Sequence, residues 1–356
     1  LIMRYNGSIN GVQNNSSPAS APGIWSINDV QENSGDSTQL GGSPDTFEYL
    51  AVGGGGGGGG AKGADQCGGG GGGGQVITGF GPINTNVNWS ITVGSGGNGG
   101  PNSDHGQNGG NTEMSPQNDN NFSIISYGGG GGRTGGLSNA NPDQVPTGGG
   151  GGFESTSQAN AGIAGSDFTG GSGAAEDSNG RGGAGGGAGA GGNGSNGYSG
   201  GGGGAGGPGV ISNFTGSNVR YGAGGGGGSN AGSGGAGGNS GGGPGAAANG
   251  TEPERGGLEA TIRSVGAGGG GAAIWGNNSD ETGGYGGPGC LILKYPAEYD
   301  LYVLPWDDNN GGGAYPPIGV SPSMHPDGIH KLSTFINFSE NNITWVKSSS
   351  LYSKEL

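Results

Sequence analysis

Long, uninterrupted runs of glycine are the feature that most limits what this chain can fold into. Glycine supplies 103 of the 356 residues, and the run 53–60 contains nothing else. Hydrophobic residues make up only 28% and charged residues 10%, whereas an ordinary globular domain is about half apolar and a quarter charged. A conventional core throughout the chain is therefore excluded. The runs are either flexible linkers or segments ordered by contacts other than side-chain burial.

Short apolar segments stand directly before several glycine runs. They are Tyr49-Leu50-Ala51-Val52, Ile124-Ile125-Ser126-Tyr127, Val219-Arg220-Tyr221 and Ile262-Arg263-Ser264-Val265. A flexible linker has no need of anchors placed so regularly, so their recurrence favours an ordered structure. We predict that the segment from Phe47 to Val52 pairs with the apolar segment from Cys290 to Pro296. The structural anchors expected from this pattern are Phe47, Tyr49, Tyr127, Tyr221, Leu291 and Leu293.

Polyglycine II is the ordered form that such runs can adopt. It is an extended left-handed helix with three residues per turn and no internal hydrogen bonds, so each N–H and C=O group needs a partner on a neighbouring chain. Ordering one residue's backbone costs about 1–2 kcal/mol, and one hydrogen bond returns a net of about 0.5–1.5 kcal/mol. A single run is therefore unstable alone, and we expect many runs to pack together.

The predicted fold class is mostly β and irregular, with short strands framing a packed bundle of polyglycine II helices and little or no α-helix. Three segments are expected: a polar connector or assembly segment at 1–45, the glycine-rich domain at 46–296, and an aromatic-containing β segment at 297–356. The last is either a small β module or a set of strands that pair with another subunit.

Two hairpins are predicted from alternating apolar residues. The first joins 75–78 to 88–93 across Gly81-Pro82, and the second joins 335–338 to 343–346 across Asn341-Asn342.

Charge excludes two classes of partner. The formal net charge is −15, with 11 Lys and Arg against 26 Asp and Glu, whereas nucleic acids and anionic membranes require clustered positive charge. No apolar run approaches the roughly 20 residues of a membrane span. We therefore expect no nucleic-acid partner and no membrane insertion. Whether Cys67 and Cys290 form a disulfide stays open.

No cofactor, metal or catalytic site is predicted. The sequence Gly58-Gly59-Gly60-Ala61-Lys62-Gly63 lacks the Ser or Thr that a phosphate-binding loop needs after its lysine. The three histidines, His105, His325 and His330, fit no zinc motif and are expected in surface loops. Asp177 and Asn179 match only part of a calcium loop. Because no Ser/His/Asp arrangement or paired acids in an aromatic groove are evident either, we expect a protein that is not an enzyme.

The glycine-rich body resembles the glycine-rich domain of bacteriophage tail fibres and related virion proteins. The similarity rests on the opening Tyr49-Leu50-Ala51-Val52-Gly53, the junctions Tyr127-Gly128 and Tyr221-Gly222, and the closing Gly287-Pro288-Gly289-Cys290-Leu291-Ile292-Leu293-Lys294-Tyr295. The segment Pro22-Gly23-Ile24-Trp25-Ser26-Ile27 is similar to one that often precedes this domain in marine phage proteins. In relatives of this kind, polyglycine II helices form a rigid layered body whose connecting loops contact the receptor.

This resemblance implies a virion or extracellular structural protein, a tail-fibre or tip component whose loops bind a host cell-surface receptor or glycan. It also implies association with other virion subunits and a homo-oligomer. The alternatives are a filament subunit assembled by inter-subunit strand or polyglycine pairing, and a disordered adhesive material. Binding residues concentrate in loops held by a rigid scaffold, so aromatic residues between runs are the receptor-contact candidates: Phe153, Phe168, Tyr198, Trp275 and Tyr285. The same residues fit packing positions on the faces of the bundle equally well.

Overall fold

The computed structural model describes ten stretches of the chain: 46–62, 66–117, 122–135, 145–154, 161–239, 241–247, 265–274, 280–304, 322–336 and 341–347. The chain divides into two units, Leu1–Thr46 and Phe47–Leu356. All of the described residues except Thr46 belong to the second unit.

The described residues contain fourteen β-strands and no α-helix. The strands are β1 (Thr46–Val52), β2 (Gln66–Cys67), β3 (Val76–Pro82), β4 (Asn88–Thr92), β5 (Thr112–Pro116), β6 (Ile124–Ser126), β7 (Phe153–Glu154), β8 (Val210–Ser212), β9 (Val219–Tyr221), β10 (Cys290–Pro296), β11 (Tyr299–Leu304), β12 (Ser323–Met324), β13 (His330–Phe335) and β14 (Asn341–Lys347). This confirms the predicted fold class, mostly β and irregular.

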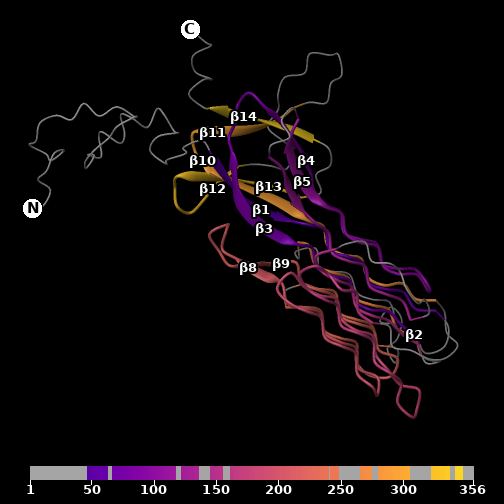
Figure 1. Cartoon of the computed structure of the whole chain (residues 1–356). Coiled ribbons are helices and arrows are strands. Elements are labelled where there is room, and N and C mark those ends of the chain that lie inside the picture. Colours follow the sequence, from indigo (N-terminus) through magenta and orange to yellow (C-terminus); the bar gives the residue numbers. More distant parts are fainter. Residues whose placement is uncertain are drawn as a thin grey trace, which may run out of the picture. The chain divides into compact units, whose positions relative to one another are not determined.

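Two five-stranded antiparallel sheets share one hydrophobic core. The first sheet has the order β12-β13-β10-β1-β3, and the second has the order β11-β14-β4-β5-β6. Alternate residues of both sheets point into the core, which is rich in aromatic rings, as expected for two packed sheets. Its members include Phe47, Trp89, Met114, Leu291, Tyr295, Phe335 and Trp345. Figure 1 shows the sheets at one end of this unit and the glycine segments extending from them.

The predicted pairing of the first and last strands of the glycine-rich domain is confirmed. β1 and β10 are antiparallel neighbours, with Glu48 opposite Lys294 and Val52 opposite Cys290. The glycine run after Val52 and the one before Cys290 therefore enter the bundle side by side.

The hairpin predicted between 75–78 and 88–93 is wrong. β3 lies in the first sheet beside β1, whereas β4 lies in the second sheet. β3 lies beside β1 because Gly79 and Gly81 leave room for the rings of Tyr49 and Phe47, with which an added Cβ would collide. These glycines let rings of the neighbouring strand lie across the backbone of β3.

The hairpin predicted between 335–338 and 343–346 is also wrong. β13 pairs with β10 and β12 in the first sheet, whereas β14 pairs with β11 and β4 in the second. Alternation along β14 buries Ile343 and Trp345 in the shared core, and that burial decides its position. The described strands of 297–356 thus pair with strands of their own chain, in both sheets.

The glycine run 53–60 is the centre of a hydrogen-bonded bundle. We call each such extended glycine segment a rod. Successive N–H groups of the rod 53–60 donate to three different neighbouring segments in turn. Gly53, Gly56 and Gly59 donate to the carbonyls of Gln75, Gly72 and Gly69, and Gly54, Gly57 and Gly60 donate to those of Gly110, Gln107 and Asp104. Gly55 and Gly58 donate to the carbonyls of Gly287 and Gly284. Because acceptor numbers fall as donor numbers rise, these three neighbours are antiparallel.

The carbonyl groups of the same rod accept from three further segments. Gly54 and Gly57 accept from Gly129 and Gly132, Gly55 and Gly58 from Gly97 and Gly100, and Gly56 and Gly59 from Gly269 and Ala272. These neighbours are parallel, and all of these N···O distances lie between 2.8 and 3.0 Å. A different neighbour at each of three successive residues is the pattern of a threefold helix, which confirms the predicted polyglycine II bundle.

Close packing leaves no room for side chains inside this rod. At each of its eight positions, an added Cβ would overlap a backbone carbonyl oxygen of a neighbouring segment. The second run, 68–74, bonds in the same way: Gly68, Gly71 and Gly74 to Ala272, Gly269 and Gly266; Gly69 and Gly72 to Arg133 and Gly130; Gly70 and Gly73 to Gly185 and Ala188. The requirement for glycine is therefore the close approach of neighbouring backbones.

A buried threonine joins the sheets to the bundle. The Thr112 hydroxyl donates to the carbonyl of Val52 at 2.7 Å and accepts from the N–H of Gly94 at 3.0 Å. These groups lie where three strands pass into rods, and Thr112 has no exposed surface. The hydroxyl thus satisfies two backbone groups at the point where sheet pairing stops.

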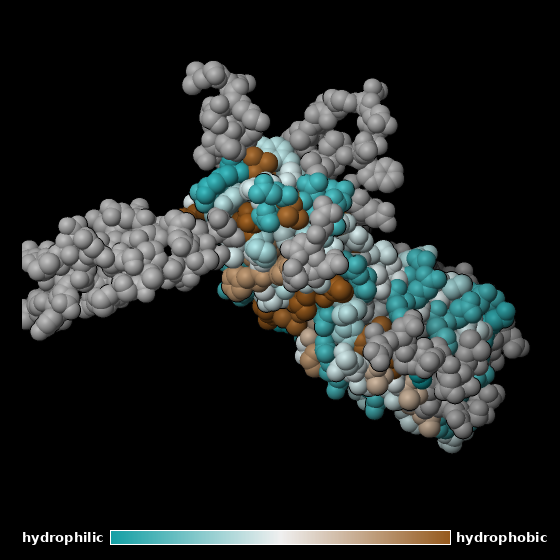
Figure 2. All heavy atoms as spheres, turned by 45° about the horizontal axis from the view of Figure 1, so that its top comes forward, coloured by the Kyte–Doolittle hydropathy of each residue, from teal (hydrophilic) through white to brown (hydrophobic). Residues whose placement is uncertain are grey.

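The outer face of the first sheet is covered by the β8–β9 hairpin. Leu50, Ile292 and Leu332 of this face pack with Tyr221 of β9 in a second apolar cluster. In Figure 2, brown residues gather near the sheets, whereas the surface of the bundle is mostly teal and white. Side-chain burial therefore stabilises the sheet end of this unit, and backbone hydrogen bonding stabilises the rods.

Candidate functional site

Three turns meet at the ends of adjacent rods, at the end of these rods that is opposite to the β8–β9 hairpin. They are 177–181, 198–202 and 229–233, and together we call them the tip. The rod 222–228 begins directly after β9 and ends at the third turn. A backbone hydrogen bond links the first two turns: the N–H of Gly200 donates to the carbonyl of Arg181 at 3.2 Å.

Ser229 and Asn230 hold the three turns together from within. The Asn230 side chain accepts from the N–H of Gly182 at 2.9 Å and donates to the carbonyl of Gly180 at 3.0 Å. The Ser229 hydroxyl donates to the carbonyl of Gly201. Both residues are buried, with Asn230 only 1% exposed. The tip is therefore held in one arrangement by side chains that do not face the solvent.

The outer surface of the tip is polar and carries charges of both signs. One oxygen of Asp177 accepts from the N–H groups of Asn179 and Arg181, at 2.8 and 2.9 Å. The Arg181 bond is the main reason that the pKa of the Asp177 carboxyl lies below its ordinary value. Asp177 is therefore ionised at neutral pH, and the side chains of Glu176 and Arg181 are exposed beside it.

The aromatic receptor-contact candidates do not come together. Tyr198 lies in the tip with 62% of its surface exposed, and Tyr285 is 49% exposed in the rod 281–287. Phe168 is half-buried at the opposite end of the rod that leads to Asp177. Trp275 lies outside the described residues.

Phe153 requires a correction, because it is only 1% exposed and cannot present its ring to a receptor. Its ring packs with Cys67, Ala184, Ala246 and Ala273. It also lies against Gly182, where an added Cβ would overlap the ring. Phe153 is thus a packing residue beneath the tip.

Four of the six proposed structural anchors are buried, Tyr49 is partly buried, and Tyr127 is exposed. Phe47, Leu291 and Leu293 have no exposed surface, Tyr221 is buried in the second apolar cluster, and Tyr49 packs against the main core. Tyr127 is 45% exposed, so its ring is not a core anchor. Its backbone carbonyl accepts from the N–H of Gln75 at 2.9 Å, so Tyr127 contributes through its main chain.

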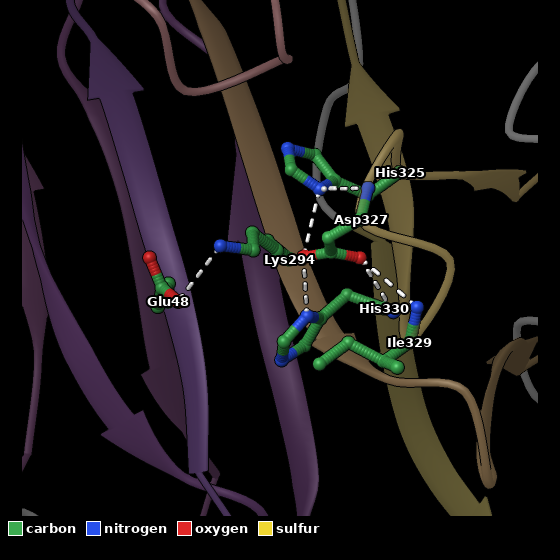
Figure 3. Close-up of polar contacts among 6 residues, drawn as sticks. All are labelled: Glu48, Lys294, His325, Asp327, Ile329 and His330. Carbon is green, nitrogen blue, oxygen red and sulfur yellow. Dashed lines mark hydrogen bonds and ion pairs between the residues drawn. The ribbon is translucent and has the colours of Figure 1, made fainter.

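A second polar cluster lies in the turn between β12 and β13 (Figure 3). One carboxylate oxygen of Asp327 is 2.9 Å from Nδ1 of His325 and 2.7 Å from Nδ1 of His330. Partial burial by itself raises the pKa of Asp327, but hydrogen bonds from the Ile329 backbone and from His330 outweigh it and hold the pKa below its usual range. Beside this turn, Glu48 and Lys294 form an ion pair at 3.0 Å. The cluster stabilises its own turn, and the expected surface-loop histidines are these two.

His105 differs from the other two histidines because the backbone group that it binds lies in a distant segment of the bundle and not in its own turn. Its Nδ1 accepts from the backbone N–H of Thr134 at 3.1 Å, so this nitrogen carries no proton. Burial lowers the pKa of His105 and the charge of Arg133 lowers it further, while Asp104 opposes both. At pH 6.5, where a free histidine is half protonated, His105 in the folded protein is therefore mostly neutral.

We expect the bundle to lose stability on acidification through His105. Below pH 6.5 the unfolded chain binds a proton that the folded chain does not, so the free energy of unfolding falls as pH falls. Thermal unfolding and amide exchange of Thr134, followed from pH 7.5 to 5, measure this slope. The variant His105→Asn keeps an acceptor oxygen near the same place without a titrating group, and its slope should be shallower. Identical slopes for both proteins would contradict the assignment.

Other site classes can be assessed for the described residues alone. Among them, no group of three His, Cys, Asp or Glu side chains is arranged to hold a metal ion. No helix in that part of the chain is long and apolar enough to cross a membrane. Cys67 and Cys290 are both buried and are not joined by a disulfide, and burial raises the pKa of Cys290 to about 12.

Sequence reasoning missed Ser229, Asn230 and Arg181 as tip residues. A signal was present, since Ser and Asn directly after a glycine run commonly bond to nearby backbone groups in turns. The backbone carbonyls to which Ser229 and Asn230 donate, however, belong to turns about 30 and 50 residues earlier in the chain.

Comparison with known proteins agrees with this architecture. No curated protein sequence matches the chain. Residues 31–296 match the glycine-rich domain family, which is more than half of the chain and spans β1, the rods and β10. The chain therefore belongs to the glycine-rich domain family.

Proposed function

We propose that the protein is a non-enzymatic virion structural protein, a component of a phage tail fibre or of the end of such a fibre. In this proposal it attaches to the host surface through the three turns that we call the tip. The observation that carries this proposal is the locking of the three turns by buried Ser229 and Asn230. Turns fixed before binding lose little conformational entropy when a partner docks. A bundle of backbone-bonded rods is a rigid support for such a surface.

The proposed partners follow from location and charge. A host cell-surface receptor or glycan contacts the tip, and other virion subunits, including further copies of this chain, contact the opposite end. The net charge of −15 disfavours nucleic acid and anionic membranes as partners. The proposed location is the virion or the extracellular space.

A second candidate function is that of a filament subunit. The supporting observation is Tyr285, half-exposed on the side of the rod 281–287, where the bundle of a second copy would add further rods. Electron micrographs of purified protein separate the two functions: long helical polymers favour the filament, and short particles favour the attachment protein.

Host binding should depend on the clamp inside the tip. Replacing Asn230 by alanine leaves the buried N–H of Gly182 without its acceptor, at a cost of about 1–3 kcal/mol. We expect binding of the purified chain to host cells to weaken at least about tenfold, measured by cell pull-down and by surface plasmon resonance on host envelopes.

The matched control is Asn193→Ala, at the other end of the rod that leads to Tyr198. Its side chain accepts from the N–H of Thr169 at 2.8 Å, so the substitution also removes a side chain–backbone bond. It should leave host binding unchanged. Equal loss of binding in both variants would argue against the tip, and absence of binding by the unmodified chain would argue against attachment as the function.

A further inference from the structure

Tyr198 presents a fixed aromatic surface at the tip. The turn is closed by its N–H donating to the carbonyl of Gly202 at 2.8 Å, and by Gly201 donating to the Tyr198 carbonyl at 3.1 Å. A Cβ added to Gly202 would lie 3.2 Å from Cδ2 of the ring, so the ring rests against the Gly202 backbone. Since 62% of the residue is exposed, the rest of the ring is open to solvent.

A carboxylate lies beside the turn that carries this ring. Oδ1 of Asp177 is held by two backbone N–H groups, and Oδ2 lies 4.0 Å from the position that a Cβ on Gly200 would occupy. Gly200 belongs to the same turn as Tyr198, so a hydrogen-bond acceptor lies against the turn that presents the aromatic surface. An apolar ring beside a polar acceptor suits a ligand with C–H faces and hydroxyl edges.

Charge decides between classes of such ligands. The three turns carry one carboxylate, Asp177, and one guanidinium, Arg181; the exposed Glu176 directly precedes the first turn, and the whole chain is strongly acidic. Sialylated, sulfated or phosphorylated glycans require clustered positive charge, which these turns do not supply. An uncharged sugar meets no such repulsion.

We propose that Tyr198 is a stacking surface for a neutral sugar ring of a host glycan, with Asp177 accepting from the sugar hydroxyls. This inference rests on the proposed attachment function and names the ligand class at the same tip. Tyrosine is favoured at contact sites because it offers a large rigid surface with few rotatable bonds.

The test uses the full chain and a defined glycan array. The probes are immobilised neutral oligosaccharides of glucose, galactose, mannose and N-acetylglucosamine, with sialylated and sulfated counterparts. We expect binding to neutral probes that falls at least about tenfold in Tyr198→Ala and is retained in Tyr198→Phe. Tyr285→Ala is the matched control, because it removes a similarly exposed tyrosine from the side of the bundle, and it should bind like the unmodified chain.

Each outcome bears on one proposal or on both. Neutral-glycan binding that Tyr198→Ala leaves intact, or binding to charged probes only, overturns the stacking site. Host-cell binding that depends on Tyr198 without any glycan binding also overturns the ligand class and indicates a protein receptor. Cell binding without glycan binding or Tyr198 dependence removes this inference and leaves the attachment function standing. Absence of both cell and glycan binding removes both.

Discussion

Replacing Gly58 by alanine should destabilise the protein by about 3 kcal/mol or more. Gly58 lies in the central rod, where its N–H bonds to Gly284 and its carbonyl accepts from Gly100. An added Cβ would overlap the carbonyl oxygen of Gly270. Because neighbouring rods are fixed by their own hydrogen bonds, none can move aside without breaking several of them. Thermal unfolding should show a fall in Tm of at least about 6 °C.

Gly192→Ala is the control for this prediction. An added Cβ there would meet only the ring of Pro208, at 3.2 and 3.3 Å. Both substitutions remove one glycine and reduce the entropy of the unfolded chain alike, so their difference reports packing alone. We expect Gly192→Ala to change stability by less than about 1 kcal/mol. Equal effects at the two sites would mean that the rods are not closely packed in solution.

Replacing Trp345 by alanine should cost about 3–5 kcal/mol, the range for removing a buried aromatic ring. Trp345 of β14 is 1% exposed and stacks on Phe47 of β1, with ring centroids 5.5 Å apart. It also meets the edge of Tyr295 of β10 at 4.9 Å. The substitution therefore opens a cavity between the two sheets, and unfolding followed by circular dichroism and by tryptophan fluorescence measures the loss.

Trp345→Phe is the matched control. It keeps an aromatic ring and removes an indole N–H that has no hydrogen-bond partner among the described residues. The smaller ring loses some burial, while the unpaired buried donor disappears, so we expect a loss below about 2 kcal/mol. Unfolding of the C-terminal strands in a separate early transition in Trp345→Ala would contradict a core shared by both sheets.

The ends of the glycine-rich domain were predictable because the flanking strands carry side chains. The segment from Phe47 to Val52 and the one from Cys290 to Pro296 are apolar on both faces, and such strands must be covered on both sides. They form β1 and β10 and pair directly. The two predicted hairpins failed because neighbouring strands in sequence joined opposite sheets. Local alternation indicates a strand but does not name its partner.

The tip was only partly predictable for the same reason. Tyr198 stood between glycine runs and was recognisable as a loop aromatic, and it is exposed in the structure. Phe153 had the same sequence context, yet its ring is buried against Gly182. The difference depends on which rod passes beside each residue, and that neighbour lies far away in the sequence.

The sequence by itself determined that backbone groups must bond between segments, because runs without side chains cannot form a core and polyglycine II has no internal hydrogen bonds. It also placed the turns, where Asn, Ser, Asp and Pro interrupt the glycine. Only the tertiary structure decided which rods are neighbours, which strands share a sheet, and which turns form the tip. Identical glycines carry no information about register. The alignment of rods is instead set by the paired strands at their ends and by lateral bonds between residues as distant as Gly58 and Gly284.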